Sequence, residues 1–301
     1  LACRPGEYVK HRCPSVNVSR KVMLSRLRRC RDIVPGGSDL REGHMVDTPI
    51  SFSDGASYEL MMGEWSRSAG ADFLNWLQPA PALAWLDVGC GSGAFSSLVV
   101  ERCAPLSLLG IDPSEGQLSF ARTRGLGAVA MFKAGDAMEI DLPENSVDVA
   151  VAALVLHFMP DPLRGVREMA RVVRPSGVVS AYTWDLEDNG FPYEAVHRAM
   201  REVGLEMLSP PHPEAGNADE QLRLWTAAGL DDVRQREISV FRTFSDFDQY
   251  WKTATISPRI AAGLAELAPD QIATLQEVTR SYLLESSVFV ARANAISGRV
   301  S

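Results

Sequence analysis

The chain has 301 residues, of which 46% are hydrophobic and 23% charged, with 23 glycines and 18 prolines. This composition is typical of a globular protein and excludes a collagen-like or wholly disordered chain. The net charge of −8 is unevenly distributed, because residues 1–44 contain 10 Lys and Arg against 4 Asp and Glu, and the rest contains 20 against 34. An acidic body argues against broad binding to a nucleic-acid backbone, which needs clustered basic side chains.

The first 44 residues are basic and differ from the rest of the chain. They show neither a helical nor a strand-like apolar period, and Tyr8 is their only aromatic residue, so we expect a disordered tail ahead of a folded body at 45–301. A basic nucleic-acid or targeting arm is the alternative interpretation. Because the chain begins at Leu1 and its composition changes at Met45, we also interpret the tail as a translated or artificially added segment.

The five cysteines indicate neither a zinc site nor a disulfide framework. They stand at positions 3, 13, 30, 90 and 103, without a CxxC pair or paired histidines. The longest apolar run, residues 147–159, is too short to cross a bilayer. We therefore expect a cytoplasmic protein with no metal and no membrane span.

Strand and helix signals alternate from about residue 83 and predict βαβ units around a mostly parallel sheet. The first strand is predicted over Leu83–Gly89. A strand over Val147–Leu156 is apolar almost throughout, as expected for a central strand covered on both faces. We further predict helices over 94–103, 114–124 and 162–175, and strands over 106–112, 129–132 and 177–184.

The pattern changes after Asp185. Helices are predicted over 193–203 and 218–228, and two long strands over Val233–Phe244 and Ser287–Ala295. The helical stretch between these strands is too long for a hairpin loop. We therefore expect cap helices within about 186–230 and 245–284.

The strongest chemical signal is the glycine-rich segment Leu86–Gly93, which reads LDVGCGSG and joins the first strand to the first helix. Glycines let the backbone turn tightly and approach a ligand, and the helix N-terminus offers unpaired N–H groups. A glycine-rich loop alone is weak evidence, but this one has the strand-to-helix context that a nucleotide site requires.

Two acidic residues follow at the ends of the next strands. Asp112 stands 19 residues after Gly93, where a carboxylate can accept hydrogen bonds from ribose hydroxyls. Asp136 follows the third strand, where its side chain can accept from an adenine amine. Either residue alone is often an ordinary turn residue, but together with the loop they indicate a bound nucleoside.

The loop spacing favours one nucleoside over another. A dinucleotide site usually reads GxGxxG, whereas this chain reads GxGxG with Asp87 two residues earlier. A carboxylate there suits an ammonium or sulfonium better than a pyrophosphate. S-adenosylmethionine (SAM) therefore fits better than NAD, although Asp87 by itself could also be a loop-capping residue.

In these residues the sequence resembles the class I SAM-dependent methyltransferases of the type 11/25 domain, particularly the branch similar to ubiquinone and menaquinone C-methyltransferases. The likeness is good over about 57–185 and looser elsewhere. Ser176 is a departure, because glycine is common before Gly177. The motifs that carry the likeness are Leu86–Gly93, Gly110–Ser114, Gly135–Ala137, Leu142–Pro143 with Ser146–Asp148, Leu156–Pro162 and Glu168–Gly177.

The resemblance implies an α/β, Rossmann-like fold with strand order 3-2-1-4-5-7-6, strand 7 antiparallel, and helical cap insertions. It implies SAM as the cofactor across the carboxyl ends of strands 1, 2 and 3, with the glycines against its methionine part. Residues implied to contact SAM are Tyr58, Asp87, Gly89, Cys90, Gly91, Gly93, Asp112, Pro113, Asp136, Ala137, Met138 and Ala153.

Methyl transfer from a sulfonium requires alignment and desolvation of the acceptor more than a dedicated nucleophile. A general base is needed only for a phenol, a hydroxyl or a carbon acid. His157, just past the fourth strand, is the candidate catalytic base, and a structural histidine beside the following proline is an equally good interpretation.

The acceptor is expected to be a small hydrophobic or aromatic molecule. Aromatic residues around the expected mouth of the site favour it, although each alone is more often a core residue. The predicted substrate-binding residues are Phe52, Trp65, His157, Trp184, Tyr250 and Trp251. The fourth strand lacks the Asn/Asp-Pro-Pro-aromatic ending of base-amine methyltransferases, and the body has no basic stripe, so nucleic acid is disfavoured.

The sequence therefore predicts a SAM-dependent methyltransferase, a monomer or a homodimer, acting on a small molecule. A non-catalytic SAM-binding regulator and an NAD-dependent oxidoreductase are the alternatives.

Overall fold

The computed structural model describes residues 55–205, 209–283 and 288–301. Its centre is a seven-stranded sheet with order β3-β2-β1-β4-β5-β7-β6, in which β7 is antiparallel to both neighbours. This confirms the predicted topology. The strands are β1 (Ala84–Val88), β2 (Ser107–Asp112), β3 (Ala130–Ala134), β4 (Val147–Ala153), β5 (Val173–Trp184), β6 (Asp231–Thr243) and β7 (Val288–Arg299). The predicted tail at 1–44 and Phe52 lie outside the described residues.

Helices cover both faces of the sheet and form a separate cap. One face packs against α2 (Gly55–Leu77) and α3 (Ala94–Cys103), and the other against α5 (Pro162–Val172) and α7 (Ala218–Ala227). The helix α4 (Glu115–Arg122) lies along β2 and β3. The cap consists of α6 (Glu194–Glu202), α8 (Phe247–Ala254), α9 (Pro258–Ala265) and α10 (Pro269–Tyr282). Short 3-10 turns are η1 (Gly127–Val129), η2 (Leu156–Phe158) and η3 (Pro213–Gly216).

Local sequence signals account for several element starts. The side chain of Ser114 accepts from the N–H of Gln117 at the start of α4, and that of Asp161 accepts from the N–H of Arg164 before Pro162 opens α5. The inner residues of β4 are buried on both faces, which the continuous apolar run predicted. The strand β4 ends at Ala153, three residues earlier than predicted, because the left-handed φ of 60° at Leu154 interrupts the hydrogen bonding between strands.

The helix α7 differs from its predicted place in the cap. Its residues Leu224 and Trp225 are buried in the core cluster shared with α5, and Trp225 Nε1 donates to the carbonyl of Val179 at 3.1 Å. The indole thus anchors α7 to β5, so this helix covers the sheet.

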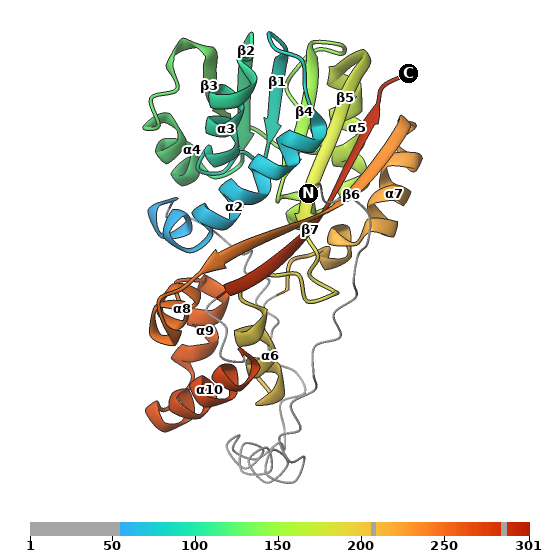
Figure 1. The fold of residues 1–301 in the computed structure, drawn as a ribbon. Coiled ribbons are helices and arrows are strands. Elements are labelled where there is room, and N and C mark those ends of the chain that lie inside the picture. Colours follow the sequence, from blue (N-terminus) through green and yellow to red (C-terminus); the bar gives the residue numbers. More distant parts are fainter. Residues whose placement is uncertain (1–54, 206–208, 284–287) are drawn as a thin grey trace, which may run out of the picture.

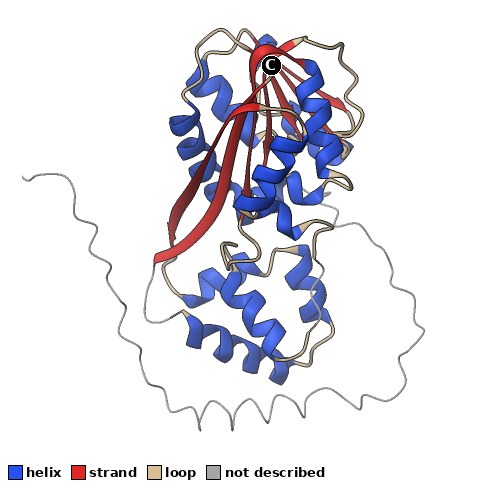
Figure 2. Cartoon of the chain, turned by 90° about the vertical axis from the view of Figure 1, so that its right-hand side faces the viewer, coloured by secondary structure: helices blue, strands red, loops and turns tan. Residues whose placement is uncertain are grey.

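The strands β6 and β7 form a long antiparallel ribbon that runs from the sheet to the cap (Figure 1). The cap therefore lies beyond the carboxyl ends of β1 to β5, as both views show (Figure 2). Among the described helices, none is long and apolar enough to cross a membrane.

Candidate functional site

The sequence-predicted ligand residues meet at one edge of the sheet. Pairing of Val88 with Ile111 and with Ala152 brings the ends of β1, β2 and β4 together, and Asp112 pairs with Ala134 of β3. Between β1 and β4 the chain order of the parallel strands reverses. Ligands of open α/β sheets bind in the crevice at such a switch point.

The three glycines of the loop after β1 are required by its backbone. Gly89, Gly91 and Gly93 have φ values of 69°, 51° and 75°, in the left-handed region that favours glycine. A Cβ on Gly89 would also lie 2.4 Å from Cγ2 of Val155, which follows β4. Glycine adopts these angles without the steric cost that a Cβ would add, and at Gly89 there is also no room for a Cβ.

Asp87 places a carboxylate with one unused oxygen under this loop. Its side chain is 2% exposed, and Oδ2 accepts from the hydroxyl of Ser96 at 2.6 Å, whereas Oδ1 has no hydrogen-bond partner. Burial raises the pKa of Asp87 to about 7; hydrogen bonding by Ser96 opposes this rise, and the charge of Asp112 adds to it. An orphaned buried oxygen is costly, and a cationic ligand would satisfy it.

Asp112 ties the loop to the end of β2. Its carboxylate accepts from the N–H of Gly91 at 2.9 Å and from the N–H of Ser114 at 2.8 Å. Burial raises its pKa, and these two hydrogen bonds oppose the rise. An ionised carboxylate has about four lone-pair sites, so acceptor capacity remains for a ligand. Pro113, the next residue, is exposed.

The other predicted cofactor residues differ in their exposure to solvent. Asp136 is exposed and accepts from the N–H of Met138 at 2.9 Å, and Ala137 and Ala153 are half-buried. The side chain of Cys90 lies in the small core cluster with Leu118, Ala121 and Phe132. Tyr58 lies in α2, and its side chain is not described.

His157 lies in η2, directly beyond β4, and is 4% exposed. Its carbonyl accepts from the backbone N–H of His212, whose ring Nε2 is 3.1 Å from the carbonyl of Pro160. The Glu214 carboxylate, 2.8 Å from Nδ1, raises the pKa of His212. His212 of the neighbouring loop thus contacts the backbone at two points, within the turn at His157 and after it at Pro160.

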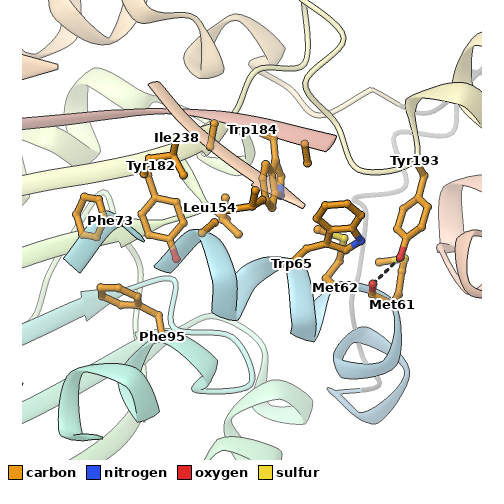
Figure 3. Close-up of a cluster of buried hydrophobic side chains, with 14 of the residues drawn as sticks. Met61, Met62, Trp65, Phe73, Phe95, Leu154, Tyr182, Trp184, Tyr193 and Ile238 are labelled. Carbon is orange, nitrogen blue, oxygen red and sulfur yellow. Dashed lines mark hydrogen bonds between the residues drawn. The ribbon is translucent and has the colours of Figure 1, made fainter. Parts of the chain in front are cut away.

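The predicted aromatic substrate residues are in the core rather than at an open mouth. Trp65, Trp184, Tyr250 and Trp251 belong to one buried cluster between α2, the sheet and the cap, in which Figure 3 labels Trp65 and Trp184. Their exposed fractions are 1%, 3%, 0% and 9%. Phe52 lies outside the described residues.

Two hollows lie among the described residues. One of about 690 Å³ is lined by residues of the loop 136–143 and shares only Asp136 with the predicted cofactor residues, so it is not the crevice at β1 and β4. The other, of about 210 Å³, lies in the cap. Its lining includes Phe191, Tyr250, Tyr282 and Phe289, with Asn189 and Glu194 as polar members.

Sequence reasoning missed three residues around the glycine loop. The hydroxyl of Ser96 donates to Asp87. The side chain of Gln117 is 4% exposed, and its Oε1 lies 3.8 Å from where a Cβ on Gly91 would be. Arg124 contacts the loop at Ser92. No local sequence pattern indicates that these residues contact the loop, because Ser96 lies in α3, Gln117 in α4 and Arg124 just after α4. Within the described ranges, no group of three or more His, Cys, Asp or Glu residues could hold a metal ion.

Comparison with known proteins gives a consistent result. Residues 86–181 match the family model described as a methyltransferase domain. An uncharacterized methyltransferase of Mycobacterium tuberculosis H37Rv is 37% identical over 135 residues, which is 44% of this chain and 53% of the relative. The 27-O-demethylrifamycin SV methyltransferase of Amycolatopsis mediterranei is 31% identical over 160 residues, or 52% of this chain and 57% of the relative. The chain thus spans about half the length of these relatives.

A solved structure shares the fold. The phosphoethanolamine N-methyltransferase 2 of Haemonchus contortus, in complex with SAM, superposes with a TM-score of 0.53 and 16% identity, over 81% of this chain and 56% of that chain. At this identity the likeness concerns the fold alone.

Proposed function

We propose that the protein methylates a small hydrophobic or aromatic molecule. The premise is that residues 86–181 of this chain form a class I SAM-dependent methyltransferase domain. The observation that carries the proposal is the buried Asp87 with its unused oxygen beneath a loop of three left-handed glycines. An acidic group at that position suits the cationic methionine part of SAM and would repel a pyrophosphate.

The residues present fit SAM in the following arrangement. Gly89, Gly91 and Gly93, with the backbone of Cys90, would pack against the methionine part, and Asp87 would accept from its ammonium. Asp112 would accept from the ribose hydroxyls with its remaining lone pairs. Asp136, Ala137 and Met138 would contact the adenine. Pro113, Ala153 and Tyr58 would close the site.

Methyl transfer requires no nucleophile from the protein itself. When bound, SAM supplies a methyl group already activated by its sulfonium. The crevice and the cap would hold the acceptor in line with that methyl group and exclude water, which accounts for most of the rate enhancement available to such a reaction. His157 would take the proton of an acceptor that must lose one.

The acceptor class is inferred from the cap. Its hollow of about 210 Å³ has an aromatic lining in which Tyr250 stacks on Phe289 with ring centroids 4.4 Å apart. Because Asn189 and Glu194 also belong to this lining, it suits a planar aromatic molecule that carries a polar group. The predicted roles of Trp65, Trp184 and Trp251 in acceptor binding stay predictions, as does the narrower likeness to quinone C-methyltransferases.

Calorimetric titration with SAM, S-adenosylhomocysteine and NAD tests the cofactor. We expect binding of the first two and none of NAD, and tight NAD binding without SAM binding would overturn the proposal in favour of an oxidoreductase.

Incubation with methyl-labelled SAM and a fractionated metabolite extract tests catalysis. We expect label in a phenol, quinone or lipid fraction. Reproducible absence of transfer from a protein that binds SAM would favour a non-catalytic regulator.

A further inference from the structure

Arg124, just beyond the end of α4, joins three elements around the glycine loop. Its Nε donates to the carbonyl of Ser92, one terminal nitrogen lies 3.2 Å from the hydroxyl of Ser92, and that nitrogen is 2.7 Å from Oε2 of Glu59 in α2. The guanidinium also lies over the ring of Phe120, 5.4 Å from its centroid. The Arg124 side chain is 18% exposed, so these contacts are partly shielded from water.

Glu59 reaches Arg124 because Gly63 leaves room for it. A Cβ on Gly63 would lie 2.9 Å from Cδ and Oε1 of Glu59, which shows that the carboxylate folds back over this glycine. The absence of a side chain one helical turn further along α2 thus permits the ion pair.

The loop that Arg124 touches is the part of the site with few side chains of its own. Gly91 and Gly93 flank Ser92, and both have left-handed backbone angles. Glycine can adopt many other backbone conformations, so these residues do not by themselves hold the loop in this one. The contacts of Arg124 with Ser92 reduce the number of other conformations that the loop can adopt. A ligand that binds only the observed loop conformation then binds more tightly.

We infer that Arg124, held by Glu59, is a positioning residue for cofactor binding, which fixes the glycine loop against α2 in the conformation that SAM requires. The inference rests on the proposed function, and it adds that the first turns of α2 belong to the cofactor site through this ion pair. Arg124 acts on the loop and not on the acceptor.

A second ion pair on α2 provides a matched control. Arg67 donates to both carboxylate oxygens of Glu101 in α3 at 2.8 and 3.0 Å, but its side chain and that of Glu101 are 57% and 55% exposed. It joins α2 to another element, here the helix α3, without contacting the glycine loop. Glu101→Gln should therefore change SAM affinity by less than about twofold.

The test measures SAM affinity by calorimetry for the full chain and for the variants Glu59→Gln, Arg124→Gln and their combination. We expect Glu59→Gln to weaken SAM about fivefold, and Arg124→Gln about tenfold because it also loses the bonds to Ser92. The double variant should bind SAM no more weakly than Arg124→Gln alone, because Glu59 acts on the loop only through Arg124. Arg124→Lys should recover part of the affinity.

Gly63→Ala separates positioning from general stability. Alanine stabilises a helix relative to glycine, so the thermal midpoint should not fall. The new Cβ would force the flexible end of Glu59 to shift away from its place over Gly63, so SAM affinity should fall, by no more than in Glu59→Gln. A merely structural role of the ion pair would move both quantities in the same direction.

A readout without SAM keeps the inference separate from the proposed function. The amide of Gly91 donates to Asp112 and that of Gly93 to the carbonyl of Cys90. Hydrogen exchange at these two amides should accelerate in Glu59→Gln and stay unchanged in Glu101→Gln. Equal exchange and equal SAM affinity in these two variants would overturn the inference, whereas a wild-type chain that binds no SAM would overturn the proposed function.

Discussion

Asp87→Asn should remove a pH dependence of SAM binding that the buried carboxylate creates. Burial raises the pKa of Asp87 to about 7, and its unused oxygen needs a cation that only the ionised form attracts strongly. Wild-type affinity should therefore fall below pH 7, by about tenfold for each unit, since one pKa unit corresponds to ~1.36 kcal/mol. Above about pH 8 it should fall again, because an α-amino group loses its proton there.

The same raised pKa lowers the stability of the folded protein at neutral and alkaline pH. A carboxyl whose pKa is raised from 3.8 to about 7 on folding binds its proton more tightly in the folded state. Stability is then lost as pH rises from about 4 to 7, up to about 4 kcal/mol for this shift. Asp87→Asn should recover much of that free energy at pH 8 while it weakens SAM binding.

Calorimetry between pH 5.5 and 8.5, with urea unfolding at pH 8, measures both effects. Asp136→Asn is the control, because Asp136 is exposed and its loss should lower affinity by a similar factor at every pH. Buffers of different ionisation enthalpy should report release of nearly one proton on binding at pH 6. An acid limb that persists in Asp87→Asn, or wild-type affinity that is flat between pH 5.5 and 7.5, would refute the reasoning.

Three further substitutions test the site. Asp112→Ala should weaken SAM more than tenfold in calorimetry, because it removes the charged acceptor proposed for the ribose and the partner of the Gly91 amide, and unchanged affinity would mean that Asp112 is misassigned. Gly89→Ala should lower the free energy of unfolding by about 2 kcal/mol or more in urea titration, because of its positive φ and the contact with Val155; wild-type stability would contradict the loop geometry. His157→Ala should leave SAM affinity within about twofold and abolish transfer to an acceptor that must lose a proton. Intact turnover would reduce His157 to a structural residue.

Most helices and strands, and the chemistry at the ends of the strands, could be predicted from local sequence patterns. The helix at Ala94–Cys103 was predicted with its observed bounds, and the strand order follows from the family likeness. These features depend on local signals such as apolar periodicity, caps and glycines, which short stretches of sequence contain. Asp87, the glycines and Asp112 were predictable for the same reason, since each lies at the end of a predicted strand.

Which distant side chains meet follows from the three-dimensional packing. It placed α7 against the sheet, because the indole of Trp225 reaches β5, and it buried Trp184 at a strand end where the sequence predicted an acceptor contact. It raised the pKa of Asp87, because desolvation depends on everything packed around the carboxylate. It also joined Arg124 to Glu59, 65 positions earlier. No periodicity or motif encodes such a pair, because its geometry arises only when α2 and α4 lie against the same loop.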